Sequence, residues 1–529
     1  MLNLTACTTE LLLVLMTISV SISDAVAQIP ASPDSALAAA LDDIGGQPLT
    51  LANAVDLAMA NSTAILEAEA ILAAARGRRR SERGAFDPEL FIEGERLRNE
   101  TPTSSPFSGA DVLVNNQTTF NSGVRSTLTT GTEISASLQT VRTRTNSAFA
   151  ALNPQYSGVG RLQVRQPLLA GAGIGADTDY QAARLGEAAA EALYADAVNM
   201  VHAAVEELYW DLYAAERDLA VQTLIRERAQ ALLEESQLRA RAGLVGPNQV
   251  ENARVFLAEQ ELAVIDGEEF LEALSDEMAS LIGTRPAGST RKFKPVDEPP
   301  SMVPVGNVDA VLDKALESNL VLEAARADLE QTRVRVGAAR RNRLPRVDLV
   351  GSLGSNGLSG EARDVIFGSD TLRSASDGDF FDALNQIRDL EFPTWTIGLN
   401  VTIPIGSRRW SGELSQRRAE VEAAEQRYIA AERALEEQVR RSHRELMSGQ
   451  ERLEIARRGV TASQEQVRIG LIEYRNGRTT AFELVRLGAD LAAAEQRFSQ
   501  ALVRTAKAAA ALARLTSGAF PFVSQQNTR

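Results

Sequence analysis

Two segments, 173–242 and 406–476, each hold about 70 residues without a proline and carry apolar or small residues at heptad spacing. The alternating steps of four and three residues predict coiled-coil helices. At 1.5 Å per residue, each helix would be a rod of roughly 100 Å. A globular domain seldom needs such a helix, so the two rods constrain the fold more than any other feature of the chain.

Shorter helical patterns accompany each rod. They cover 49–84 and 247–283 around the first rod, and 306–343 and 478–516 around the second. Each is about half as long as a rod. Two half-length helices stacked end to end would cover one rod. This arrangement predicts a strand-rich insert at one end of the rods and a tight turn at the other.

The chain reads as two copies of one unit. The chain is predicted to begin with a signal peptide (1–27) and an N-terminal segment (28–48). The first repeat (49–284), a proline-rich linker (285–305), the second repeat (306–517) and a C-terminal tail (518–529) follow. Strands are expected at 88–169 in the first repeat and at 345–405 in the second. Prolines in the linker exclude a continuous helix between the repeats.

The N-terminus has the features of a secretory signal. An apolar run from Leu11 to Val20 is too short to cross a bilayer as a helix, and Ala25 and Ala27 form a small-residue cleavage site. We therefore expect cleavage after Ala27 and an exported protein. No basic residue precedes the apolar run, so the start codon stays open. Cys7 precedes the run, which argues against lipidation.

Composition excludes several classes of site. The net charge of −15 argues against a protein that coats nucleic acid, and two histidines and one cysteine are too few for a disulfide framework or a His/Cys metal site. No nucleophile–base constellation stands out, and the glycine-rich segment 171–175 lacks the buried strand and spaced acid of a dinucleotide site. We therefore expect no catalytic, cofactor or metal residues, and no enzyme activity.

Residues 394–403 alternate between apolar and polar side chains. This period of two predicts a strand with one lipid-facing and one water-facing side. The predicted lipid-facing residues are Trp395, Ile397, Leu399, Val401 and Ile403. Any one such strand also fits a soluble antiparallel sheet. Together with export and the rods, a membrane barrel is favoured. About four such strands per chain are fewer than the eight of the smallest closed barrel, so closure requires several chains.

These features resemble the TolC-type outer-membrane efflux protein family. The resemblance covers about 49–517 and rests on the duplicated order of strand exits at 166–169 and 403–405 and of helix turns at 242–245 and 474–477. It implies an α+β membrane protein in which a homotrimer forms an outer-membrane β-barrel of four strands per chain. Below the barrel, coiled-coil helices would continue as an α-helical barrel, with an equatorial belt formed by the linker and C-terminal region.

The resemblance also implies the function. The protein would be a passive conduit in the outer membrane of a Gram-negative bacterium, extending into the periplasm, within a tripartite efflux or type I secretion system. An inner-membrane transporter of RND or ABC type would drive it through a periplasmic adaptor, while outer-membrane lipid would surround the barrel. The adaptor would dock at two turns, which comprise Arg241, Ala242, Gly243, Leu244, Val245, Tyr474, Arg475, Asn476, Gly477 and Arg478. The same residues also fit simple helix stops.

The resemblance places a periplasmic constriction just past the second turn. Glu483 takes the first acidic position, whereas Arg486 stands where the family pattern has an acid. A carboxylate ring would attract cations. Three residues apart on a helix, these two side chains also fit an ordinary surface ion pair, which the spacing favours slightly. The family further implies a hydrogen bond from Tyr474 to the first turn in the closed state.

Two inserts leave the strand number open. Residues 115–143 contain a hairpin-like segment that turns at 129–131, and residues 356–392 are rich in Gly, Ser and Asp. Both fit either loops at the outer mouth or additional strands. The alternatives to a conduit are a periplasmic coiled-coil adaptor, which would lack duplicated alternating strands, and a structural or adhesive envelope protein.

Overall fold

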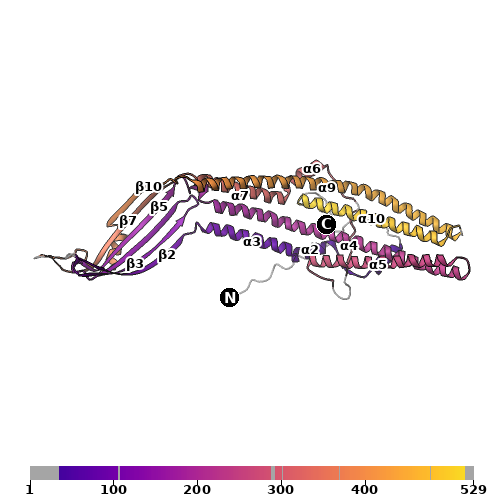
Figure 1. Cartoon of the computed structure of the whole chain (residues 1–529), viewed down its shortest axis with the longest axis horizontal. Helices are drawn as coiled ribbons and strands as arrows, with labels where there is room; N and C mark the ends of the chain where they lie inside the picture. The colour runs from indigo at the N-terminus through magenta and orange to yellow at the C-terminus, as the bar shows by residue number, and fades with distance from the viewer. Residues whose placement is uncertain are drawn as a thin grey trace, which may run out of the picture.

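The molecule is long and narrow, with a β-sheet at one end and a bundle of helices along the rest (Figure 1). The computed structural model describes residues 35–104, 108–286, 292–300, 302–367, 370–476 and 478–518. The predicted signal peptide, Gly477 and most of the tail lie outside these ranges.

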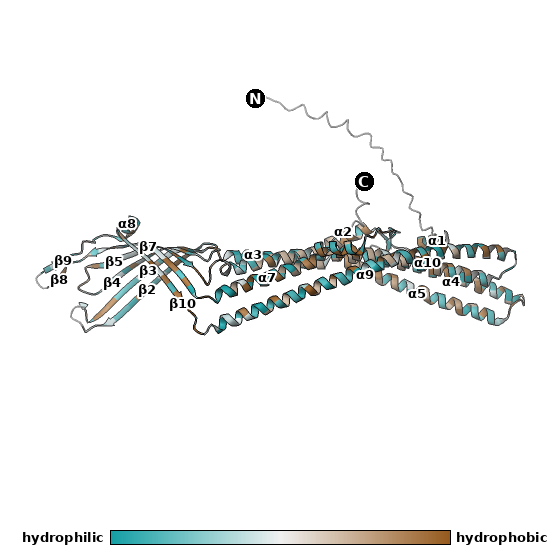
Figure 2. Ribbon diagram, turned by 90° about the horizontal axis from the view of Figure 1, so that it is seen from above, coloured by the Kyte–Doolittle hydropathy of each residue, from teal (hydrophilic) through white to brown (hydrophobic). Residues whose placement is uncertain are grey.

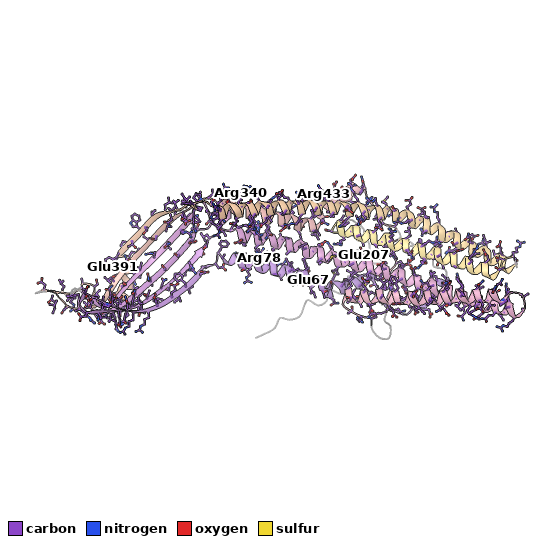
Figure 3. All side chains as sticks on the ribbon, in the orientation of Figure 1. Glu67, Arg78, Glu207, Arg340, Glu391 and Arg433 are labelled. Atoms are coloured by element: carbon purple, nitrogen blue, oxygen red, sulfur yellow. The ribbon has the colours of Figure 1, made fainter. Side chains whose placement is uncertain are left out.

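Two helices run the length of the rod, α4 (Thr178–Arg241) and α9 (Arg408–Arg475). On the side of the sheet they pack against α3 (Thr63–Gly84) and α7 (Leu320–Asn342). At the other end they pack against α5 (Pro247–Ile282) and α10 (Ala481–Leu515) (Figure 1). Charged side chains lie along both the long and the half-length helices, such as Arg78 on α3, Arg340 on α7 and Arg433 on α9 (Figure 3).

The half-length patterns before the strands are each broken into two helices, where a continuous helix was expected. Between α2 (Leu51–Asn61) and α3, Ser62 has the extended values φ −63° and ψ 122°. Asn319 does the same between α6 (Val308–Ser318) and α7, and its side chain accepts the Leu322 N–H. An extended residue interrupts the helical hydrogen bonds, and the cap satisfies an amide freed by the break.

The sheet holds six antiparallel strands in the order β10-β7-β5-β4-β3-β2. Their bounds are β2 (Glu89–Pro102), β3 (Val112–Thr127), β4 (Glu133–Thr145), β5 (Leu152–Pro167), β7 (Arg346–Ala362) and β10 (Phe392–Thr402). The insert 115–143 thus forms two full strands of the sheet. The expected four strands per chain are therefore wrong for this protein, because β3 and β4 insert between β2 and β5.

The second insert, 356–392, forms different structures. It contains the end of β7, a separate hairpin of β8 (Val365–Phe367) and β9 (Asp370–Leu372), and the helix α8 (Phe380–Arg388). The Asp379 side chain caps α8 by accepting the Phe381 and Asp382 N–H groups. This helix packs on β5 and β7, over one face of the sheet (Figure 2).

Near the middle of the rod, the linker joins the helices. Its strand β6 (Phe293–Pro295) pairs in parallel with β1 (Gln47–Leu49), which follows the helix α1 (Ser35–Asp43). The largest core lies here, between α2, α4, α5 and this linker. Among the described residues, no single helix is long and apolar enough to cross a membrane; only the bent pair α2 and α3, taken together, meets that test.

Candidate functional site

The six-stranded sheet has two chemically different faces. Residues directly opposite one another in antiparallel strands share a face. Four of the five predicted lipid-facing residues lie on one face of β10, and Ile403 directly follows the strand; all five are exposed, Trp395 by 73%. Their face continues across the sheet through the row that starts at Trp395; its further members are Leu353, Leu162, Ala136, Val124 and Leu90.

The apolar stretch shifts along the strands from one sheet edge to the other. Along β10 and the residue that follows it, the stretch runs from Trp395 to Ile403. On β2 it consists of Leu90, in the row of Trp395, and Ile92, in the row of Pro393. Along the strands, the shift is about two to three rows of ~7 Å; across the sheet, it extends over five strand spacings of ~4.8 Å. The ratio corresponds to a tilt of roughly 35° between the strands and the normal of the apolar layer. Strands of transmembrane barrels tilt by roughly 35–45°, so the stretch can lie level in a membrane.

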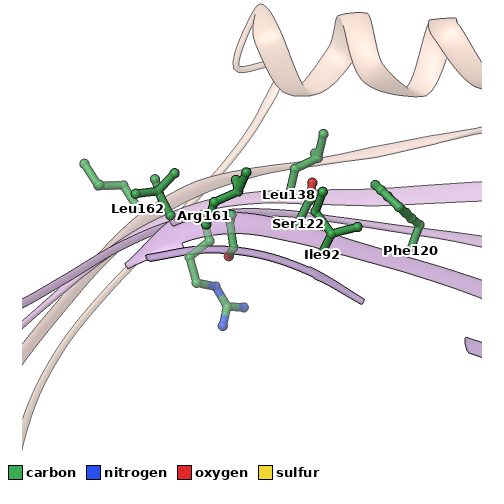
Figure 4. A pocket seen from close by; sticks show the side chains of 11 residues that line it. Ile92, Phe120, Ser122, Leu138, Arg161 and Leu162 are labelled. Carbon is green, nitrogen blue, oxygen red and sulfur yellow. The ribbon is translucent and has the colours of Figure 1, made fainter. Parts of the chain in front are cut away.

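The opposite face of the sheet is polar. Arg125 pairs with Glu89 at 2.7 Å, and Asn121 donates to Glu93 at 3.0 Å, both between β2 and β3. Arg161 extends on the other side of the strands from Leu138 (Figure 4). A face with these charges and amides is suited to water.

A charge network lies on this polar face at the end next to the helices. The Arg165 guanidinium contacts Glu133 and, at 3.1 Å, Asp348; the Arg346 Nε also lies 3.1 Å from Asp348. Asp348 is 6% exposed. The network joins β4 and β5 from the first half of the chain to β7 from the second, and therefore stabilises the junction of the two halves.

The two predicted docking turns lie together at the end of the rods opposite the sheet (Figure 1). In the first turn, Gly243 has a φ of +73°, and the Leu244 N–H donates to the Arg239 carbonyl at 2.9 Å. This is a helix end that glycine permits. Leu244 is 74% exposed and Arg241, Ala242 and Val245 lie beside it. An exposed apolar tip is available for contact with another protein.

The second turn closes in a similar way. The Asn476 N–H donates to Ile472 at 3.1 Å and the Arg478 N–H to Glu473 at 2.9 Å. Gly477 and the side chains of Tyr474 and Arg475 lie outside the described part of the structure. The predicted hydrogen bond of Tyr474 is therefore untested.

Glu483 and Arg486 form an ion pair within α10. Their side chains approach to 2.7 Å and are 37% and 61% exposed. The Thr480 side chain accepts the Glu483 N–H and caps the helix. Within one chain this is the ordinary surface pair, worth a few tenths of a kcal/mol. Its role in a constriction stays a prediction.

Tyr209 fixes the linker to the long helix α4. Its side chain is buried, and its hydroxyl accepts the Val296 and Asp297 N–H groups, each at 3.0 Å. The same hydroxyl lies 3.0 Å from the Leu49 carbonyl and from the Asp297 carboxylate. Burial raises the pKa of the Tyr209 hydroxyl far above its usual value, so it stays protonated and can donate.

Glu216 lies about two helical turns beyond Tyr209 on α4. Its exposed fraction is 5%. Burial raises its pKa to about 7, although Lys294 and Arg217 lower it. Its Oε1 atom is buried and has no hydrogen-bond partner among the described residues. Because burial outweighs these two cations, the carboxyl titrates near neutral pH.

Two features of the apolar face were not predicted from the sequence. One is the helix α8. The other is a group of four arginines, Arg96, Arg98, Arg142 and Arg144. The spacing of Asp379 and Asp382 was a usable signal for α8, because the two form a capping box. In the described residues, no group of His, Cys, Asp and Glu side chains is arranged to hold a metal ion.

Comparisons with known proteins agree with this geometry. The family described as "Outer membrane efflux protein" matches residues 311–518. No curated protein matches the chain.

Solved outer-membrane channels share the fold over most of the chain. The channel OprN is 18% identical, covers 92% of this chain and 93% of its own, and gives a TM-score of 0.60. Campylobacter jejuni CmeC is 16% identical, with coverage of 89% and 86% and a TM-score of 0.62. Neisseria gonorrhoeae MtrE, solved in an open state, is 17% identical, with coverage of 88% and 89% and a TM-score of 0.59.

Identities this low establish the fold, and the family match covers the second repeat. The expected location in the outer membrane agrees with the description of the matched family and with those of the solved channels, which are outer-membrane proteins. The resemblance to TolC-type outer-membrane efflux proteins is confirmed: residues 311–518 match the outer membrane efflux protein family, and solved outer-membrane channels share the fold over about nine tenths of the chain.

Proposed function

We propose that this chain is the outer-membrane channel of a tripartite efflux or type I secretion system. The observation that carries the proposal is the tilted six-stranded sheet with one apolar and one polar face, mounted on rods that end in two exposed turns. The apolar face contacts lipid and the polar face lines a water-filled pore. An inner-membrane pump of RND or ABC type supplies energy through a periplasmic adaptor that contacts the turns.

The open edges of the sheet support closure by several copies, and the resemblance implies a homotrimer. In one chain β10 and β2 are open edges, and exposed edges pair readily with another strand. Because the sheet has six strands, its two edge strands run in opposite directions, so β10 of one copy can pair antiparallel with β2 of the next. Three copies then close a barrel of eighteen strands, where the expected twelve would follow from four strands per chain.

This barrel is wider than a twelve-stranded one. Barrel diameter grows about linearly with strand number, and barrels of roughly 16–18 strands leave an aqueous channel. The diameter is thus about one and a half times that of a twelve-stranded barrel. We therefore propose that the outer-membrane part of this conduit admits bulkier solutes.

The test measures pore width from the outer side. Purified protein is inserted into planar bilayers, and poly(ethylene glycol) of increasing size is added to the side of the sheet loops. Deleting residues 112–145 removes β3 and β4 and leaves β5 able to pair antiparallel with β2. We expect the deletion to lower the size of the largest polymer that enters.

A matched control deletes residues 365–372, the hairpin β8–β9, which is not part of the six-stranded sheet. This variant should keep the polymer limit. Equal limits in all three proteins would contradict the wide barrel, and a wild-type protein without single-channel conductance would contradict the conduit. A monomer in detergent, with no heat-sensitive oligomer on gels, would favour the alternative of a non-transporting adaptor or envelope protein.

A further inference from the structure

Four arginines form a patch on the apolar face of the sheet, on the side away from the helices. Arg96 and Arg142 lie in one cross-strand row, on either side of Thr118, and Arg98 and Arg144 lie in the next. All four are exposed. At the spacings of a sheet, the patch measures roughly 10 by 7 Å.

The patch carries an excess of positive charge. Glu100 pairs with Arg98 at 2.6 Å. The Arg142 guanidinium lies 5.9 Å from the centre of the Tyr156 ring, an attractive cation–π geometry. No ion pair is present for Arg96, Arg142 or Arg144 within the part of the chain that the structure describes. A lipid-facing surface seldom carries unpaired arginines without an anionic partner.

An apolar hollow lies directly beside the patch, one to three rows nearer the helices. Its lining includes Leu90, Ile92, Phe120, Leu138 and Leu162 (Figure 4). On β2 and β4, the two strands that carry the arginines, the surface therefore changes from apolar to basic along the strand direction. This order matches a lipid whose acyl chains lie along the strands and whose head group lies above them.

Helix α8 forms the other border of this surface. Its Ile387 side chain packs over Gly158 and Gly160, where a Cβ would lie 2.6 Å from it. Its Phe380 ring makes an edge contact of 5.9 Å with Tyr156, and Phe381 is 66% exposed. Aromatic side chains gather at the membrane–water boundary. The row of Arg142 and Tyr156 therefore marks that boundary on the outer side.

We propose that this surface binds a phosphorylated lipid of the outer leaflet, with its phosphates on Arg96, Arg142 and Arg144 and its acyl chains in the hollow. The proposal rests on the outward orientation of the apolar face in the proposed barrel. Guanidinium groups bind phosphate through two parallel hydrogen bonds. Neutral or zwitterionic lipids lack the excess negative charge that the patch needs.

The experiment compares lipid retention by the purified oligomer. Wild-type protein is reconstituted in phosphatidylcholine nanodiscs that contain lipid A with two phosphates, and bound lipid is counted by native mass spectrometry. The variant R96Q/R142Q/R144Q should retain at least roughly tenfold less lipid A, because one basic residue near an anionic surface contributes roughly fivefold. Lipid A with a single phosphate should bind the wild type more weakly.

Arg125→Gln is the matched control, because it removes an exposed arginine that lies on the polar face of the same sheet and does not line the hollow. It should retain lipid A like the wild type. Equal retention by the triple variant, in an oligomer that still dissociates at the wild-type temperature, would overturn the lipid site. Displacement of lipid A by inorganic phosphate alone, with no dependence on acyl chains, would also overturn it. Single-channel conductance of the same samples tests the proposed conduit separately.

Discussion

The buried Glu216 makes the stability of this protein depend on pH. Its pKa is about 7 in the folded chain, against a usual value of 4.5. Below pH ~4.5 the carboxyl is protonated in both states, and the folded state has its full stability. As the pH rises from ~4.5 to ~7, the unfolded chain loses this proton while the folded chain keeps it, so the free energy of unfolding falls; above pH ~7 the folded carboxyl ionises as well and the loss is complete.

The size of the effect follows from the pKa difference. One pKa unit corresponds to about 1.4 kcal/mol, so the change between pH 5 and pH 8 amounts to at most about 3 kcal/mol per chain. Glu216→Gln keeps the shape and removes the titration. We expect this variant to match the wild type near pH 5 and to exceed it in stability at pH 8.

The assay is thermal unfolding of the purified oligomer, followed by circular dichroism at pH 5 and pH 8. Glu191→Gln serves as the control, because Glu191 is an exposed carboxylate on the same helix; it should leave the pH dependence unchanged. If Glu216→Gln unfolds at a lower temperature than the wild type at pH 8, the carboxylate is instead stabilised by Lys294 or Arg217, and the reasoning is refuted.

Three further substitutions test other parts of the fold. Tyr209→Phe removes the partner of the Asp297 N–H but leaves Val296 its bond to Leu49, so it should cost about 1–3 kcal/mol in thermal unfolding; no change would contradict the role of the hydroxyl. Asp348→Ala removes the partner of the half-exposed Arg346 and one of the two carboxylates at Arg165, which keeps Glu133, so it should cost roughly 1–3 kcal/mol. A lower dissociation temperature of the oligomer on gels would show this loss, and an unchanged temperature would show that Asp348 is dispensable. Gly243→Trp should abolish export while the oligomer still assembles. Gly243→Ala places a residue at the same positive φ but adds little bulk, so it should keep export. Normal export by the tryptophan variant would exclude docking at this turn.

The strand β10 was predictable because its apolar and polar residues alternate without interruption. Every outward residue from Trp395 to Ile403 faces the apolar layer, so the alternation is complete. In β3 the outward residues Asn116 and Thr118 lie in the rows of the arginine patch, beyond the apolar layer. Polar residues then occupy both faces, and the period of two disappears. This is why the sequence left open whether 115–143 forms strands.

Properties that depend on distant contacts were not predictable. Glu216 occupies a position on α4 that predicts an ordinary helical glutamate, and only the packing of other elements around α4, including the linker that carries Lys294, buries it. The arginine patch combines residues of β2 and β4, which are joined only through the register of β3. The turns at Gly243 and Arg478 were predictable in position, because glycine after a long helix is a local signal.

The six strands per chain also affect how well the circumference of the proposed barrel matches that of the helical ring below it. Four connections per chain enter the helical part, through α3, α4, α7 and α9, because β3 and β4 are joined to each other at that end by a turn. In the proposed trimer, twelve helices at roughly 9–10 Å spacing make a ring of roughly 110–120 Å. Eighteen strands spaced ~4.8 Å and tilted by ~40° give a circumference of roughly 110 Å, whereas twelve would give only about 75 Å. The added hairpin therefore lets the barrel meet the helical ring at nearly equal width, without the constriction that four strands per chain would impose.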